Sequence, residues 1–233
     1  GVHTLALVPG RWNVTVGALV SSNIQVSGTG VVTPETEGKG VGGANRYTFT
    51  TVPFTFDPGA FTGQWLMERV TNWAVGNGGT FALVPGRYRF EVGNGSFVVD
   101  VADGSAAATP PDPVEITGSR AVLRTTPVDV ETGRFAGNWG IERIGTNAPG
   151  PRTLLLPPGL RYTIFLGFGS VPFDLLPDGS ARSGRLTTAI ASGRTLAFLV
   201  RYIDVDPGGF AGPWVIEGVG GSRTGRQHVA LVT

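Results

Sequence analysis

Few side chains of this chain could carry out chemistry, and its two histidines are the first to consider. His3 and His228 lie near opposite ends of the sequence, each just before an apolar segment. Imidazoles ligate metals or titrate near neutral pH, so the two could form a metal pair or a pH switch if the ends met. The alternative is that both are polar residues at strand ends. A zinc site needs further nitrogen or thiolate ligands, and neither histidine has one nearby, so we predict no metal site.

Carboxylates recur beside turns rather than in ligand-like clusters. They lie near the Asp-Pro-Gly-type turns: Asp57, Asp129, Asp204 and Asp206. Calcium needs several oxygen ligands, and one or two carboxylates per turn are too few. Asp-Pro-Gly is itself a turn sequence, so a structural role is predicted.

Catalytic motifs are missing from the sequence. Glu68 and Glu142 recur, but no partner carboxylate recurs with them as a glycosidase pair would require. No G-x-S-x-G motif is present, and the glycine clusters at Gly38–Gly43 and Gly76–Gly79 lack the GK[ST] ending of a phosphate-binding loop. We therefore predict that the protein is not an enzyme and uses no cofactor.

Composition limits the partners. The formal net charge is +1 and no run of basic residues is present, so nucleic-acid binding is not expected. No apolar stretch is long enough to span a bilayer. Hydrophobic residues make up 41% of the chain, and 37 glycines and 17 prolines accompany many valines, threonines and phenylalanines. This balance favours strands joined by turns.

Three tryptophans mark an internal repeat, and this repeat must position all the residues above. Trp65, Trp139 and Trp214 are 74 and 75 residues apart, and each follows a phenylalanine by four residues and a glycine by two. In a strand such residues share one face, so a place in the core is predicted for these tryptophans. A repeat of this length fixes the architecture of a chain more than any single motif does.

The repeated blocks predict an all-β fold. An apolar strand, a Pro-Gly turn and a second, alternating strand recur at Thr4–Gly17, Thr80–Gly93 and Thr153–Gly167. We predict tandem antiparallel β-sandwich repeats, in three units of about 75 residues with one unit split across the termini.

The predicted division of the chain follows this repeat. Residues 1–30 form the back half of a split unit, residues 31–105 and 106–180 form two whole units, and residues 181–233 form the front half of a split unit. A stretch of small residues and prolines at Ser105–Asp112 is predicted to be a linker.

Both ends carry a copy of the same apolar strand. Thr4–Val8 reads TLALV, and Gln227–Val232 reads QHVALV. The split unit could be completed within one molecule, between molecules, or by neighbouring repeats of a longer chain. We predict assembly strands centred on Leu5 and Leu7 at one end and on Val229 and Leu231 at the other, because an unpaired apolar edge invites strand addition.

Two other tryptophans, Trp12 and Trp73, do not recur as tryptophan. They are candidates for an exposed platform on which a sugar ring could stack.

The L-x-PG-x-Y strand turn, the strand that closes in Asp-Gly and the G-x-W strand together resemble the transthyretin-like sandwiches. These include carboxypeptidase-regulatory-like repeats and the collagen-adhesin B-type repeats of bacterial surface proteins. The resemblance covers all three units and implies an extracellular stalk or binding module. The internal Lys–Asn crosslink of the adhesin repeats is not expected, since Lys39 lies in a glycine-rich stretch.

These observations lead to two functional hypotheses. The first is a non-catalytic structural or assembly protein of an extracellular surface, a filament or a virion, whose partner is a further copy of itself or a neighbouring repeat. The alternative is a carbohydrate-binding or adhesive module, whose partner is a polysaccharide.

Overall fold

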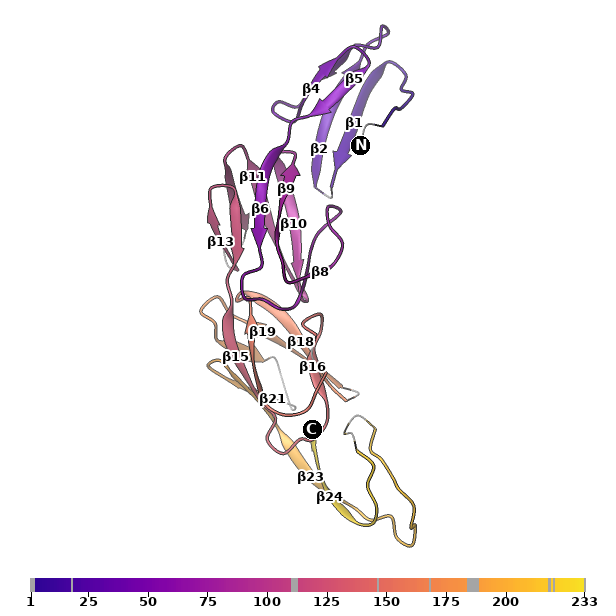
Figure 1. The fold of residues 1–233 in the computed structure, drawn as a ribbon, viewed down its shortest axis with the longest axis vertical. Coiled ribbons are helices and arrows are strands. Elements are labelled where there is room, and N and C mark those ends of the chain that lie inside the picture. Colours follow the sequence, from indigo (N-terminus) through magenta and orange to yellow (C-terminus); the bar gives the residue numbers. More distant parts are fainter. Residues whose placement is uncertain are drawn as a thin grey trace.

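The computed structural model describes residues 3–17, 19–109, 113–145, 147–167, 169–183, 189–217, 219 and 221–232. Within these residues the chain consists of strands, turns and loops without helix, which confirms the predicted all-β class. None of the residues described therefore belongs to a helix that could cross a membrane. The strands follow one another along an elongated molecule, with β1 (Gly10–Val16) near one end and β24 (Gln227–Val232) near the other (Figure 1).

The N-terminal part, residues 10–49, contains two small sheets. β1 pairs with β2 and β2 with β3, while β4 pairs with β5. The strands after β1 are β2 (Val20–Val26), β3 (Val32–Pro34), β4 (Gly40–Gly43) and β5 (Arg46–Phe49).

The first sheet pair, residues 52–123, contains a five-stranded sheet of order β12-β11-β10-β7-β8 and a four-stranded sheet of order β13-β14-β6-β9. Its strands are β6 (Val52–Asp57), β7 (Gln64–Met67), β8 (Ala74–Val75), β9 (Gly79–Leu83), β10 (Gly86–Val92), β11 (Gly95–Ala102), β12 (Ser105–Thr109), β13 (Val114–Thr117) and β14 (Arg120–Leu123). The sheets face each other across aromatic side chains, with Phe56 of β6 4.8 Å from Phe90 of β10 between ring centroids.

The second sheet pair, residues 126–198, contains four-stranded sheets of order β17-β15-β22-β21 and β16-β18-β19-β20. Its strands are β15 (Thr126–Glu131), β16 (Trp139–Ile141), β17 (Arg152–Leu156), β18 (Leu160–Leu166), β19 (Gly169–Leu175), β20 (Ala181–Ser183), β21 (Ala189–Ser192) and β22 (Thr195–Phe198). Trp139 of one sheet packs edge-on against Phe198 of the other.

The C-terminal part, residues 200–232, contains β23 (Val200–Val205) paired with β24, and between them an excursion closed by an isolated bridge from Trp214 to Arg223. It continues the long axis of the molecule beyond the second sheet pair (Figure 1).

Alternating side chains build these strands. Along β6 and β10, apolar residues at every second position are buried and the residues between them face outward, as the period of a strand requires. Phe54, Phe56 and Phe90 are among the largest fully buried side chains. Trp65 and Trp139 are also buried, which confirms their predicted place in the core.

Two pairings depart from the expected antiparallel arrangement. β14 lies parallel to β6, and β15 lies parallel to β22. In both cases the chain that connects the two strands passes through the opposite sheet, so that it returns to the first sheet in its original direction. The sheets are therefore mixed.

The predicted linker at Ser105–Asp112 is wrong over its first five residues, because Ser105–Thr109 forms β12, which pairs with β11. The remaining three residues lie outside the described part of the chain. The predicted unit boundaries after residues 30, 105 and 180 stay predictions. The pairs β2·β3 and β19·β20 form hydrogen bonds across the first and the third boundary, and the second boundary falls within β12, which pairs with β11.

Candidate assembly site

The same local structure surrounds the tryptophans of the repeat. The indole Nε1 of Trp65, Trp139 and Trp214 donates in each case to the carbonyl oxygen of the glycine eleven residues later, at 3.0, 2.7 and 3.0 Å. Each tryptophan also makes a backbone bridge to the returning segment. The C-terminal part therefore keeps the geometry that the two sheet pairs have at this point.

Burial, in contrast, differs sharply between these parts. Phe210 is 57% exposed, although its counterpart Phe61, four residues before Trp65, is 1% exposed. Ile203 of β23 is 40% exposed, whereas Phe54 at the matching position of β6 is 0% exposed. Trp214, which the sequence also places in the core, is only half-buried, so that prediction is not met in the C-terminal part. The C-terminal part thus presents an apolar face that, in the sheet pairs, is covered by a second sheet.

The N-terminal part also exposes an aromatic side chain whose counterpart in the first sheet pair is buried. Trp12 of β1 donates its Nε1 hydrogen to the Val8 carbonyl at 2.9 Å. Tyr88 of β10 donates its hydroxyl hydrogen to the Val84 carbonyl at 2.7 Å in the same way. Tyr88 is buried, but Trp12 is 36% exposed. Trp12 is therefore positioned as a core residue of a sheet that lacks part of its cover.

The sheet pairs show which strands lie beside the counterparts of β1 and β5. There, β10 lies beside β7 and β14 lies beside β6. Within the described residues, their counterparts β1 and β5 have no such neighbour. In the sequence repeat marked by the tryptophans, β23 stands at the position of β6 and residues 214–216 at the position of β7.

A turn carboxylate links two neighbouring strands of one sheet, β6 and β14. Asp57 Oδ1 accepts the N–H of Gly59 at 2.8 Å, and its Oδ2 accepts from Arg120 at 2.6 Å. The N–H of Gly59 and the Arg120 guanidinium both lower the pKa of Asp57, because each favours the charged carboxylate. Sequence reasoning identified the turn but missed this ion pair, and the recurrence of Asp-Pro-Gly at Asp206 could have indicated it.

The two histidines lie in different parts and do not form a pair. His228 Nδ1 is 2.8 Å from Asp204 Oδ1, and its ring stacks on Tyr202 with centroids 4.9 Å apart. The hydrogen bond from His228 lowers the pKa of Asp204. Thr55 and Thr80 make the equivalent contact between β6 and β9, so His228 occupies a recurrent cross-strand polar position. No cluster of three or more potential metal ligands occurs among the residues described.

The four predicted assembly residues divide between two states. Leu5 is 74% exposed and Leu7 is also exposed, in a segment without strand structure. Val229 is buried and Leu231 is half-buried within β24, which pairs with β23. The structure therefore does not bring the two groups together within one molecule.

The two predicted sugar-platform residues are also separate. Trp73 lies in the loop between β7 and β8, and the guanidinium of Arg143 covers one face of its ring at 4.2 Å from the centroid.

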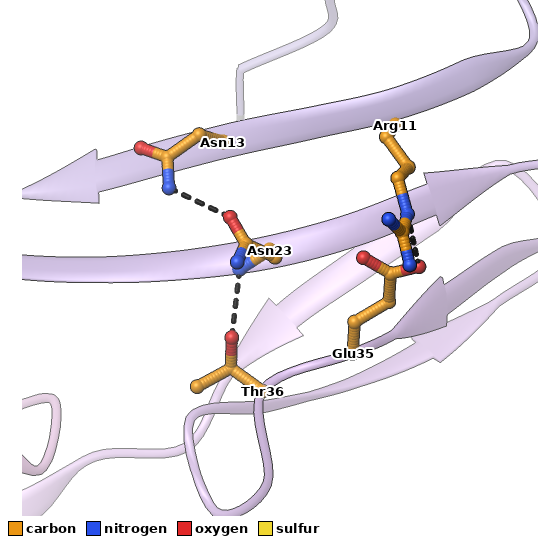
Figure 2. Close-up of polar contacts among 5 residues, drawn as sticks. All are labelled: Arg11, Asn13, Asn23, Glu35 and Thr36. Carbon is orange, nitrogen blue, oxygen red and sulfur yellow. Dashed lines mark hydrogen bonds and ion pairs between the residues drawn. The ribbon is translucent and has the colours of Figure 1, made fainter.

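The residues directly before and after Trp12 in the sequence are polar, but their side chains point to the opposite face of the sheet. Figure 2 shows them on that outer face, where Arg11 binds Glu35 at 2.8 Å and Asn13 binds Asn23 at 2.8 Å. Thr36 accepts the backbone N–H of Asn23 beside them.

An open pocket lies beside the Asp57 turn, lined by residues 57–62 and 75–78. Its one charged side chain is Asp57, which is already bound to Gly59 and Arg120. The remaining lining residues carry no second titratable side chain, so the pocket contains no pair of groups for acid–base catalysis.

The resemblance to transthyretin-like sandwiches rests on turn and strand motifs of the sequence. The chain matches no protein-family model, no curated protein and no solved structure. The resemblance therefore stays a prediction, and function is inferred below from the geometry of the two ends.

Proposed function

We propose that this protein is a non-catalytic structural protein that assembles head to tail through its two incomplete ends. In this proposal the chain is a tandem array of β-sandwich units of about 75 residues, as the resemblance to extracellular sandwich repeats implies. One unit is split, with its back half in the N-terminal part and its front half in the C-terminal part. Assembly at an extracellular surface, in a filament or in a virion is the setting that fits such an array.

One observation carries the proposal. Side chains that are buried in both sheet pairs are exposed at matching positions of the two ends, as Phe210 and Ile203 are at one end and Trp12 at the other. Exposed apolar faces of this kind mark interaction sites. Complementary strands at the two ends of one chain make a second copy the natural cover.

The energy available is sufficient only if the faces close together. Burying one large apolar side chain contributes about 1.5–3 kcal/mol, whereas association costs about 4–15 kcal/mol in lost freedom. Several side chains must therefore be covered at once, which the addition of whole strands achieves.

The arrangement of the ends favours a filament over a closed ring within one molecule. Both sheet pairs lie between the N-terminal and C-terminal parts, along one axis (Figure 1). A contact between unlike surfaces at opposite ends is heterologous, and it propagates when it does not close.

The test uses two variants that each block one end. Val14→Asp places a charge on the inward face of β1, and Ile203→Asp places one on the inward face of β23; both side chains are at least partly exposed, so the free chain should fold. We expect the unmodified chain to form longer species as its concentration rises in sedimentation velocity, while each variant alone stays monomeric. A mixture of the two should form a one-to-one dimer, because one intact end of each kind remains.

Ser21→Asp, on the outward face of β2 and opposite Thr15 of β1, serves as the control and should leave assembly unchanged. A mixture that stays monomeric would refute the proposal, and glycan screening would then be the next experiment.

A further inference from the structure

We propose a specific register for the joint, resting on the proposed function: β23 of one copy lies parallel to β5 of a second copy, and residues 214–216 of the first lie antiparallel to β1 of the second. An ion pair between Asp206 of the first copy and Arg46 of the second closes the contact. The occupant of each exposed face is thus a second copy of this chain.

The parallel register follows from the first sheet pair. β14 lies beside β6 with Arg120 opposite Thr55 and Ala121 opposite Phe56. The second sheet pair repeats this pairing, with Thr195 of β22 opposite Asp129 of β15. Transferred to the ends, the same offset places Arg46 opposite Asp204 and Tyr47 opposite Val205.

A backbone hydrogen bond accompanies each parallel pairing. The N–H of Thr55 donates to the Ser119 carbonyl at 2.9 Å, and the N–H of Asp129 donates to the Arg194 carbonyl at 3.0 Å. Arg194 therefore corresponds to Ser119 rather than to Arg120. At the joint, the N–H of Asp204 should donate to the carbonyl of Asn45 in the second copy.

The antiparallel register follows in the same way. β7 lies beside β10 with Trp65 opposite Val92 and Met67 opposite Phe90. β16 lies beside β18 with Trp139 opposite Leu166. The matching arrangement at the joint places Trp214 opposite Val16, Val215 opposite Thr15 and Ile216 opposite Val14.

Each end carries one partner of the proposed ion pair. Asp206 Oδ1 accepts the N–H of Gly208 at 2.9 Å, as Asp57 Oδ1 does from Gly59. Asp57 Oδ2 additionally binds Arg120, whereas the structure shows no cation on Asp206 among its described residues. Arg46 is exposed on β5 at the position of Arg120. The second copy therefore supplies the arginine that this turn receives from its own chain in the first sheet pair.

Crosslinking tests the register, and it is unambiguous because the chain contains no cysteine. Thr15→Cys is placed in the Ile203→Asp copy and Val215→Cys in the Val14→Asp copy, so that only one joint can form. Directly opposed residues of an antiparallel pair have Cα atoms about 4.5–5.5 Å apart, within the range of a disulfide. We expect most of the mixed dimer to become covalent under mild oxidation.

The control moves one cysteine by two residues along the same face, from Val215 to Glu217. Diagonal neighbours are about 7–8 Å apart, so crosslinking should fall at least about 10-fold. Leu66→Cys with Glu91→Cys, opposed within one chain, shows the yield expected for a correct pair. A dimer that forms but crosslinks better through Glu217→Cys, or not at all, overturns the register and leaves the proposed function standing. The absence of any dimer overturns both.

A double-mutant cycle tests the ion pair. Arg46→Gln in one copy and Asp206→Asn in the other should each weaken the mixed dimer by about 2–5-fold, the usual effect of a solvent-exposed pair. Asn keeps the turn hydrogen bond of Asp206, so the loss reports the charge. The two changes together should weaken the dimer no more than either alone, and fully additive losses would refute the pair.

Discussion

Asp57 illustrates how a turn residue can also stabilise a contact between strands that are distant in the sequence. Its carboxylate accepts from the turn through Gly59 and from Arg120 of β14, which follows more than sixty residues later. The same Asp-Pro-Gly turn at Asp206 retains only the first of these contacts within the described residues. At the residue scale, the joint between copies is therefore expected to reproduce contacts already made within the chain.

The lowered pKa of Asp57 predicts a pH dependence of stability. Because the folded pKa lies below the unfolded value of about 3.9, the carboxylate contributes stability above that value and loses it as pH falls through the folded pKa. In the Ile203→Asp background, Asp57→Asn should lower the free energy of unfolding at pH 7 by less than about 1 kcal/mol, since the pair is exposed. The difference should vanish in denaturation curves recorded near pH 2.

Asp103→Asn is the control for this experiment. Asp103 lies in the exposed turn between β11 and β12, and its replacement should leave the stability curve unchanged at both pH values. A difference between the Ile203→Asp chain with and without Asp57→Asn that persists at low pH would show that the effect is not electrostatic.

At the element scale, two segments, β24 and Thr4–Val8, match the same strand position in the proposed joint. β9 pairs with β6 in the first sheet pair, and β24 takes the equivalent position beside β23. The sequence of Thr4–Val8 is a further copy of this strand, and it is exposed and outside any strand. In the proposed joint, β24 of one copy and Thr4–Val8 of the other would compete for the same edge of β23.

This competition predicts redundancy. Removing residues 227–233 should leave head-to-tail assembly measurable, because Thr4–Val8 of the next copy can add to β23 in place of β24. The double substitution Leu5→Asp and Leu7→Asp, made without the truncation, should have little effect on assembly, since both side chains are exposed. The combination of the truncation with both substitutions should abolish assembly in a sedimentation series. Complete loss on truncation alone would mean that Thr4–Val8 cannot replace β24.

At the scale of the whole molecule, the sheet pairs are held in line by close packing at their junction. Asn94, at the tip of the β10–β11 hairpin, hydrogen-bonds Glu142 and, at 3.1 Å, Thr163. The N–H of Gln64 donates to the Arg143 carbonyl at 2.7 Å across the same junction. The first sheet pair therefore contacts the second through backbone as well as side chains, which favours a stiff rod over separately moving parts.

Gly95 predicts how this alignment can be disturbed. A Cβ atom there would lie 2.7 Å from the Leu160 Cβ, so Gly95→Ala should force the sheet pairs apart and cost about 1–3 kcal/mol of stability. Small-angle scattering of the Ile203→Asp monomer should show a broadened distribution of interatomic distances. Gly169→Ala is the matched control, because the same position of β19 has its nearest atom at 3.6 Å. Equal effects of the two substitutions would contradict a role for this contact.

Local patterns in the sequence determined the strand character of the chain. Alternation, Pro-Gly turns and the spacing of the tryptophans are properties of neighbouring residues, and they correctly predicted an all-β protein with Trp65 and Trp139 in its core. They also predicted an apolar strand near each end: Gln227–Val232 does form β24, but the prediction for Thr4–Val8 was wrong, because that segment lies outside any strand.

Only the tertiary structure decided which strands are neighbours. The parallel pairing of β6 with β14, the strand at Ser105–Thr109 and the offset of Arg194 relative to Arg120 all depend on contacts between distant residues. A strand's alternation specifies which face is buried, but not which strand covers it, because backbone hydrogen bonds are the same for every sequence. For the same reason, the exposure of Phe210 and Trp12 became evident only when their buried counterparts could be compared in three dimensions.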